Sequence, residues 1–170
     1  ILHPPGGMMI WIFAFTELIV FACAAIAFIY QRSSNIELFT SSRLELNQVL
    51  ATLNTLILIG SSFSVVKATE AYDNQFKNKS LKYLYTSLTL GIAFLVIKLV
   101  EYNEKINSNF TLGANTFFDY YWILTAFHFM HVILGVGILA ILIFYTKNDK
   151  EFLEQDFNFH TGANYWHLCD

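Results

Sequence analysis

The sequence predicts an all-α protein, a polytopic transmembrane helical bundle with four complete spans and the start of a fifth. Of its 170 residues, 55% are hydrophobic and only 14% are charged, a balance typical of membrane proteins. The apolar residues also form continuous blocks that polar connections separate. About 20 apolar residues, at ~1.5 Å each, cross a hydrocarbon core ~30 Å thick, so each long block predicts one spanning helix. We expect residues 1–170 to form a single transmembrane domain.

Composition and charge argue against several other classes of protein. The net charge of −3 and the scattered basic residues give no support to a nucleic-acid partner. Cys23 lies within an apolar block and Cys169 at the start of another, so neither a disulfide framework nor a CxxC metal motif is expected. The N-terminal segment lacks the basic region and cleavage site of a signal peptide, and we expect the first apolar block to stay in the membrane.

The first predicted span covers about residues 8–30, after a cluster of helix-breaking residues, and it contains one acidic side chain, Glu17. A charged carboxylate facing lipid at this depth costs at least ~2.5 kcal/mol, so we expect Glu17 to be protonated, partnered or directed toward other protein groups. It can serve as a proton-relay group, or it can form a structural hydrogen bond with Asn54 or with a histidine of the fourth span.

Residues 31–45 are expected to form a polar connection to the second span, at about residues 46–66. This span is rich in small and hydroxyl-bearing side chains, which let membrane helices approach closely and form hydrogen bonds with one another. We therefore expect it to be the helix that its neighbours enclose most. These polar and small residues are Asn54, Thr55, Gly60, Ser61, Ser62 and Ser64.

The third predicted span, at about residues 81–102, ends with Lys98 and Glu101. Residues three positions apart share one face of a helix, so these two side chains can meet. One interpretation is a lysine that extends its charged end toward the membrane surface from near a helix end. The other is a buried ion pair or a charged contact with a partner subunit.

The fourth predicted span, at about residues 117–145, carries His128 and His131 at depth in the membrane. Imidazole is a common metal ligand, and the pair therefore invites a metal or haem interpretation. A transmembrane bis-histidine haem needs ligands from two facing spans, however, and the remaining histidines lie in loops or at a boundary. We therefore favour buried, hydrogen-bonded histidines, whose candidate partners are Glu17, Asn54 and the serines at 61–64.

The fifth span is predicted to begin near residue 163, where the residues are typical of a membrane interface. These residues are Tyr165, Trp166, His167 and Asp170. Since the sequence ends there, we expect the rest of this helix to be missing from the given chain.

The basic residues predict the orientation of the spans. With alternating spans, one side of the membrane holds Lys67, Lys77, Lys79, Lys82, Lys147 and Lys150, and the other holds Arg32, Arg43 and Lys105. Positively charged residues are enriched on the inner side, which places the N-terminus in the cytoplasm or in the mitochondrial matrix.

Five short motifs occur in a fixed order along these spans. They are Phe15, Thr16 and Glu17; Asn54, Thr55, Ser61 and Ser62; Gly91, Lys98, Glu101 and Tyr102; Thr125, Phe127, His128, His131, Val132 and Gly135; and Tyr165, Trp166, His167 and Asp170. Each motif is weak alone. Together, over nearly the whole chain, they resemble subunit III of the haem-copper oxidase superfamily, the cytochrome c oxidase subunit III-like proteins.

The resemblance is to the short, five-helix form of this subunit, which occurs in quinol oxidases and in the NorE-type accessory protein of nitric oxide reductases. Lys98, in place of the more usual glutamine, and the closing segment 160–167 lean toward the NorE-type branch. Ala126 replaces the family's usual glycine, which implies looser packing of the fourth span. His160 stands where many relatives have a glutamate, so the resemblance gives no support to a carboxylate role in that loop.

The resemblance implies a non-catalytic accessory subunit of a terminal oxidase in aerobic respiration, which stabilises the catalytic subunit, holds phospholipid and supports proton uptake. It implies that haem and copper are bound by the partner catalytic subunit I, with no cofactor, metal ligand or catalytic residue in this chain. The membrane is then the bacterial inner membrane or the mitochondrial inner membrane. The alternatives are a nitric oxide reductase accessory protein and, from another class, a small b-type membrane cytochrome with His128 or His131 as ligand.

The candidate site residues are the polar and aromatic groups expected to form a buried seam, or a lipid or subunit interface, within the bundle. They are Glu17, Asn54, Thr55, Ser61, Ser62, Lys98, Glu101, His128, His131, Trp166, His167 and Asp170.

Overall fold

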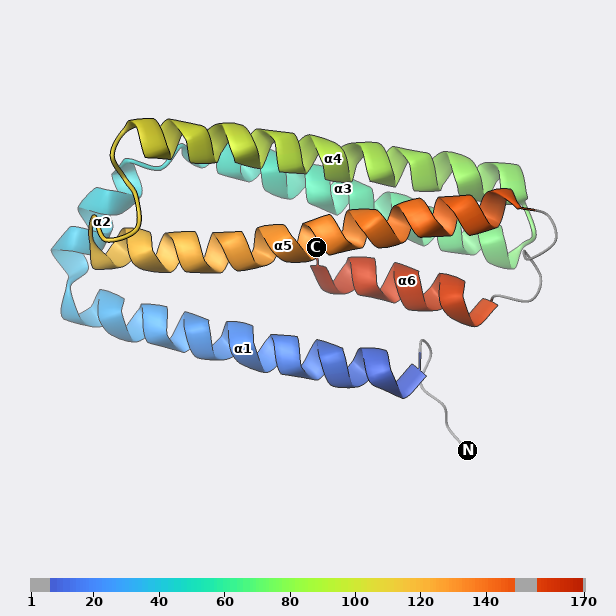
Figure 1. The fold of residues 1–170 in the computed structure, drawn as a ribbon, viewed down its shortest axis with the longest axis horizontal. Coiled ribbons are helices and arrows are strands. Elements are labelled where there is room, and N and C mark those ends of the chain that lie inside the picture. Colours follow the sequence, from blue (N-terminus) through green and yellow to red (C-terminus); the bar gives the residue numbers. More distant parts are fainter. Residues whose placement is uncertain (1–6, 149–155, 170) are drawn as a thin grey trace.

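The computed structural model describes residues 7–148 and 156–169, and within these ranges all regular secondary structure is helical. The helices are α1 (Gly7–Ser34), α2 (Ile36–Leu44), α3 (Gln48–Asp73), α4 (Lys77–Asn107), α5 (Thr116–Lys147) and α6 (Asp156–Cys169) (Figure 1). Four segments are long and apolar enough to cross a membrane, namely residues 15–34 of α1 and the whole of α3, α4 and α5. The prediction of a polytopic transmembrane helical bundle is confirmed.

The spanning helices are longer than the sequence predicts. Helix α3, which is the second predicted span, ends at Asp73 and not at residue 66. Helix α4, the third predicted span, covers residues 77–107 in place of 81–102. The hydropathy pattern marks only the part inside the membrane, whereas the helices stop where their ends are capped. The side chain of Asn47 accepts a hydrogen bond from the Leu50 amide at 3.2 Å and starts α3. Gln75, with a φ of 62°, turns the chain between α3 and α4.

Two elements differ from the sequence-based expectation. The polar connection at residues 31–45 contains the short helix α2, because Phe39 packs edge-on against Phe28 of α1 and Phe117 of α5, at ring distances of 5.3 and 5.5 Å. Helix α6 begins at Asp156, about two turns before residue 163. Its first turns are held by Phe159, whose ring stacks on Tyr72 of α3 at 3.9 Å.

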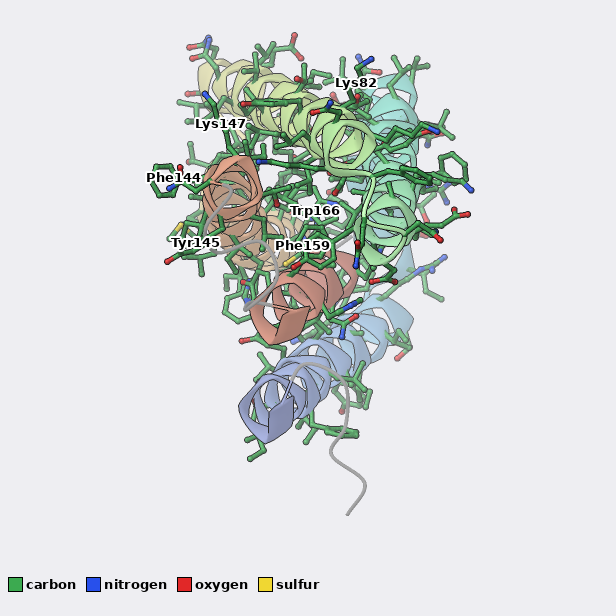
Figure 2. All side chains as sticks on the ribbon, turned by 90° about the vertical axis from the view of Figure 1, so that its right-hand side faces the viewer. Lys82, Phe144, Tyr145, Lys147, Phe159 and Trp166 are labelled. Atoms are coloured by element: carbon green, nitrogen blue, oxygen red, sulfur yellow. The ribbon has the colours of Figure 1, made fainter. Side chains whose placement is uncertain are left out.

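The long helices run alternately up and down (Figure 1). Helices α3 and α4 form a long antiparallel pair, α5 packs on α4, and α6 packs on α5 and α3. The described part of α1 contacts α2, α5 and α6 and lies at the edge of the bundle (Figures 1 and 2). The most apolar parts of α3, α4 and α5 are equally buried, so this comparison does not single out the second span as the most enclosed.

Trp166 is the largest fully buried side chain among the described residues. Its ring lies where α4 and α5 each present a glycine to α6. A Cβ added at Gly91 of α4 would lie 2.8 Å from this ring, and one added at Gly135 of α5 would also lie 2.8 Å from it. Real Cβ atoms do not approach other atoms so closely, so the two glycines create the space that the indole fills.

The lysine-rich ends of the helices meet at one end of the bundle, where α1 begins, α3 and α5 end and α4 begins (Figure 1). Figure 2 views this end, with Lys82 and Lys147 in front. The ammonium group of Lys77 donates to the Lys147 carbonyl at 3.0 Å, which ties the start of α4 to the end of α5. The predicted grouping of these lysines therefore holds for the described residues, while Lys150 lies outside them. Which side of the membrane this end faces stays a prediction.

The fit of Trp166 can be tested with a matched pair of glycine substitutions in α5. We expect Gly135→Ala to destabilise the protein by about 1–3 kcal/mol, because the added methyl group overlaps a rigid buried ring. Gly137→Ala is the control, since a Cβ at that position meets no atom within 4 Å. The measurement is unfolding in detergent. Equal stability of the two variants would show that the indole does not need this gap.

Candidate functional site

The first pair of buried polar groups joins α1 to α5. Glu17 Oε2 lies 2.8 Å from His131 Nε2, and the two side chains are only 15% and 11% exposed. The other ring nitrogen of His131, Nδ1, lies 2.7 Å from the backbone oxygen of Phe127, one turn earlier in α5. Rings of Phe21 and Phe127 pack against the imidazole. Among the candidate partners that the sequence offered for Glu17, the structure places His131 against it.

The two ring nitrogens of His131 differ in their contacts. A carbonyl oxygen only accepts hydrogen bonds, so His131 Nδ1 donates to the Phe127 oxygen. Glu17 Oε2 lies close to Nε2, but it is buried and has no hydrogen-bond partner among the described residues. The pair is therefore a close approach of two ionisable side chains from different helices, which is an unusual feature inside a membrane span.

The second pair lies within α4. The ammonium group of Lys98 is 3.1 and 3.0 Å from the two carboxylate oxygens of Glu101, and these side chains are 12% and 6% exposed. Tyr121 of α5 donates its hydroxyl proton to Glu101 Oε1 at 2.5 Å. The interpretation of Lys98 as a lysine that reaches the membrane surface is wrong, and the buried ion pair is present. The physical reason is that α4 continues to Asn107, so Lys98 does not lie near a helix end.

The small polar residues of α3 serve mainly as contacts between helices. The hydroxyl oxygens of Ser61 and Ser87 of α4 lie 2.7 Å apart in the buried core. Ser62 Oγ lies 2.8 Å from Nδ1 of His167, which joins α3 to α6. Thr55, by contrast, is exposed and donates to the Ala51 carbonyl of its own helix at 3.0 Å. The sequence analysis offered the serines at 61–64 as candidate partners of the α5 histidines, whereas Ser61 contacts Ser87, Ser62 contacts His167 and Ser64 donates to the Gly60 carbonyl.

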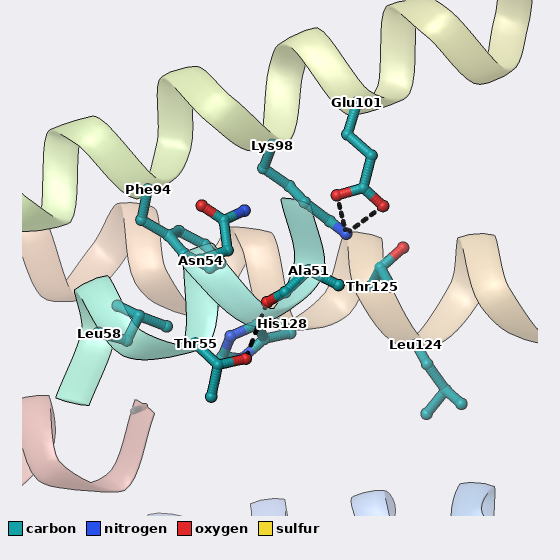
Figure 3. A pocket seen from close by; sticks show the side chains of 10 residues that line it. All are labelled: Ala51, Asn54, Thr55, Leu58, Phe94, Lys98, Glu101, Leu124, Thr125 and His128. Carbon is teal, nitrogen blue, oxygen red and sulfur yellow. Dashed lines mark hydrogen bonds and ion pairs between the residues drawn. The ribbon is translucent and has the colours of Figure 1, made fainter. Parts of the chain in front are cut away.

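Two cavities adjoin these pairs. The first, of about 310 Å³, lies between α3, α4 and α5, and its polar lining includes Asn54, Lys98, Glu101 and His128 (Figure 3). The second, of about 200 Å³, is lined by Glu17, Leu18, Phe21, His128, His131, Leu168 and Cys169. His128 is the residue common to both linings, and its ring also packs edge-on against Phe94 at 5.7 Å. Neither cavity is apparent from the sequence, because each depends on how the helices are rotated.

The structure does not bring all candidate residues into one continuous seam. Glu17, His131, Lys98, Glu101, Asn54 and His128 surround the two cavities. Trp166 packs between glycines, His167 faces Ser62, and Asp170 lies outside the described residues. The sequence analysis missed Tyr121, although a tyrosine inside an apolar span is itself a signal, since its hydroxyl needs a partner there.

Metal binding was weighed for the histidines of α5. Within the described residues, no group of three or more His, Cys, Asp and Glu side chains could hold a metal ion. Both ring nitrogens of His131 have close polar neighbours, in Phe127 and Glu17. The geometry of this histidine therefore fits a structural or proton-holding role better than that of a ligand.

The fold and the buried pairs define a polytopic helical membrane protein that holds ionisable side chains inside the bundle. Comparison with known protein families then identifies the family to which this membrane protein belongs. The family model for cytochrome c oxidase subunit III matches residues 6–170, and the chain belongs to this family.

Individual relatives agree with the family match. The chain is 32% identical over 118 residues to cytochrome c oxidase subunit 3 of Spodoptera frugiperda, covering 69% of this chain and 78% of the relative. It is 30% identical over 118 residues to the proteins of the same name from Aedes aegypti and Bos mutus grunniens, again over 69% of this chain. In these last two cases the match spans 44% of the length of the relative.

The buried pair in α4 has a natural control in α3. Lys67 and Glu70 are also three residues apart and 2.6 Å from each other, but their side chains are 39% and 58% exposed. We expect Lys98→Met to destabilise the protein by about 3–5 kcal/mol, because it leaves the carboxylate of Glu101 buried without its counter-charge. Lys67→Met should have little effect, since water solvates the exposed Glu70.

The measurement for this prediction is unfolding of both variants under the same conditions. Adding Glu101→Gln to Lys98→Met should recover much of the lost stability, because the uncompensated charge is then removed. If Lys98→Met is no more harmful than Lys67→Met, the carboxylate of Glu101 is solvated and the pair is not a buried one.

Proposed function

We propose that this chain is a non-catalytic accessory subunit of a haem-copper terminal oxidase in aerobic respiration. The observation that carries the proposal is the family match over residues 6–170, together with the helical membrane fold. The oxidase that it joins would hold haem and copper in its catalytic subunit I. The role of this chain would be to bind and stabilise that subunit, in the bacterial inner membrane or the mitochondrial inner membrane, with the N-terminus on the cytoplasmic or matrix side.

Phospholipid binding is part of this proposal. The cavity of about 200 Å³ between α1, α5 and α6 has mostly apolar walls, including Leu18, Phe21 and Leu168. The described part of α1 exposes large apolar side chains along its length, such as Phe15 and Ile19. An acyl chain is the ligand that suits such walls. This chemistry supports a lipid held between α1 and the rest of the bundle.

Support of proton uptake by the complex is the second part of the proposed function. Glu17 Oε2 and His131 Nε2 are 2.8 Å apart, and each of these side chains can carry a proton. An ionisable pair inside a membrane span is a recognised feature of proton pathways. The pair lies where α1 meets α5, beside the apolar cavity. We infer that it takes up and releases a proton during turnover of the complex.

Purification through a tag on this chain tests the proposed assembly. We expect a haem-copper catalytic subunit to co-purify, with the haem absorbance following that large subunit. Oxygen consumption by the purified complex identifies an oxidase, whereas nitric oxide consumption identifies the alternative partner, a nitric oxide reductase. Recovery of the chain without a haem-copper subunit contradicts the proposal. A Soret band that stays with the separated chain and is lost in His128→Ala would instead identify a small b-type cytochrome.

The proton-uptake role predicts a specific effect of Glu17→Gln. The amide of the variant can still donate to His131 Nε2, so α1 should stay in place and the complex should assemble normally. The amide cannot take up or release a proton. As the pH rises and protons become scarce, turnover of the variant complex should therefore begin to fall at a lower pH than turnover of the wild-type complex. The measurement is the pH profile of turnover at equal amounts of assembled complex.

Glu17→Leu serves as the structural control, because it removes both hydrogen bonding and proton exchange. It leaves His131 Nε2 without its close polar neighbour and should therefore reduce assembly itself. If the pH profiles of Glu17→Gln and the wild-type complex superimpose, the pair has a structural role only.

A further inference from the structure

The polar cavity between α3, α4 and α5 is not used by the proposed function. Its volume is about 310 Å³, and its walls include Asn54, Thr55, Lys98, Glu101, Thr125 and His128 (Figure 3). Apolar walls are provided by residues such as Leu58 and Phe94. It therefore differs from the mostly apolar cavity beside Glu17.

Asn54 shows that the cavity needs an occupant. Its side chain is only 4% exposed, and neither the amide nitrogen nor the amide oxygen has a hydrogen-bond partner among the described residues. The same residue lines the cavity (Figure 3). A buried amide with both of its groups unpaired is rare in folded proteins, and such groups are normally satisfied by ordered water when the neighbouring space is large enough.

The chemistry of the lining favours a small neutral ligand that both donates and accepts hydrogen bonds. Lys98 has three N–H groups and two contacts with Glu101, so at least one N–H remains for the cavity. The hydroxyl groups of Thr55 and Thr125 already donate to backbone oxygens, and their own oxygens are left as acceptors. The ion pair has no net charge, so the lining selects neither an anion nor a cation.

Size agrees with water as this ligand. One water needs roughly 10–15 Å³ of such space, so a cavity of about 310 Å³ has room for a cluster. Each water also needs two to four polar partners, and the amide of Asn54, the ammonium group of Lys98 and the ring of His128 provide them from three different helices.

We propose that this cavity, which opens to the surface beside the exposed Ala51 and Thr55 of α3, is a water site anchored by Asn54 and Lys98, and that it keeps His128 in contact with water inside a membrane span. His128 lines the second cavity as well, together with Glu17 and His131. The side chain of His128 therefore borders both the proposed water site and the cavity beside the Glu17–His131 pair. The proposal concerns the chain itself, and it does not depend on which reductase or oxidase the chain joins.

Hydroxyl-radical footprinting of the intact complex tests this water site. X-ray pulses make radicals from bound water, and these radicals oxidise the side chains that touch it. Phe94 and Phe118 form a matched pair, since they are 5% and 0% exposed and only Phe94 lines the cavity. Leu58 and Leu139 form a second pair of the same kind. We expect Phe94 and Leu58 to be oxidised several-fold faster than Phe118 and Leu139.

Two variants test the anchor. Asn54→Leu fills part of the cavity and removes both amide groups, so it should bring the oxidation of Phe94 down to the level of Phe118. Thr52→Val is the control on the same helix, since Thr52 is exposed and its hydroxyl donates only to the Gln48 carbonyl. It should leave the oxidation of Phe94 unchanged. If Asn54→Leu leaves it unchanged as well, Asn54 does not hold the water.

Exchange of the histidine C2 hydrogen with deuterated water gives a second readout, residue by residue. We expect His128 to exchange several-fold faster than His131, whose ring is enclosed by Phe127, Phe21 and Glu17. Equal oxidation of Phe94 and Phe118 in the wild-type complex, or exchange at His128 no faster than at His131, overturns the proposal. Both comparisons use the wild-type protein and so remain valid if a variant fails to fold.

Discussion

The packing of Trp166 against Gly91 and Gly135 is the interaction on which the rest of the bundle depends. It fixes α6 against α4 and α5 at a distance that no larger residue at either glycine would allow. Helix α6 in turn contacts α1, which also packs on α5 and α2. The packing of α6 therefore contributes to the placement of α1, the helix that carries Glu17.

Burial of ionisable side chains is the second constraint, and the protein meets it in two ways. Lys98 and Glu101 pair opposite charges within one helix, where the spacing along the chain already brings them together. Glu17 and His131 come from different helices, so their 2.8 Å approach depends on how α1 and α5 pack. This difference is the reason why we propose proton exchange for the α1–α5 pair and a structural role for the pair in α4.

The sequence was sufficient for the fold class and for the membrane-spanning blocks, because hydropathy reports directly on contact with lipid. It was not sufficient for α2 or for the start of α6, which depend on Phe39 and Phe159 meeting aromatic rings far away in the chain. It limited the partners of Glu17 to a few groups, and it could not choose among them, because the choice depends on how α1 and α5 are rotated. The two cavities lay beyond sequence analysis for the same reason.

The space filled by Trp166 also limits how this protein can change over evolutionary time. Positions 91, 135 and 166 lie on three helices, yet they share one volume, so none of them can grow unless another shrinks. A substitution at one glycine is tolerable only on a background where the indole has already been replaced by a smaller side chain, and that replacement alone leaves a void. A change from one well-packed combination of these residues to another therefore passes through a less stable intermediate sequence. For this reason we expect positions 91, 135 and 166 to change slowly and together.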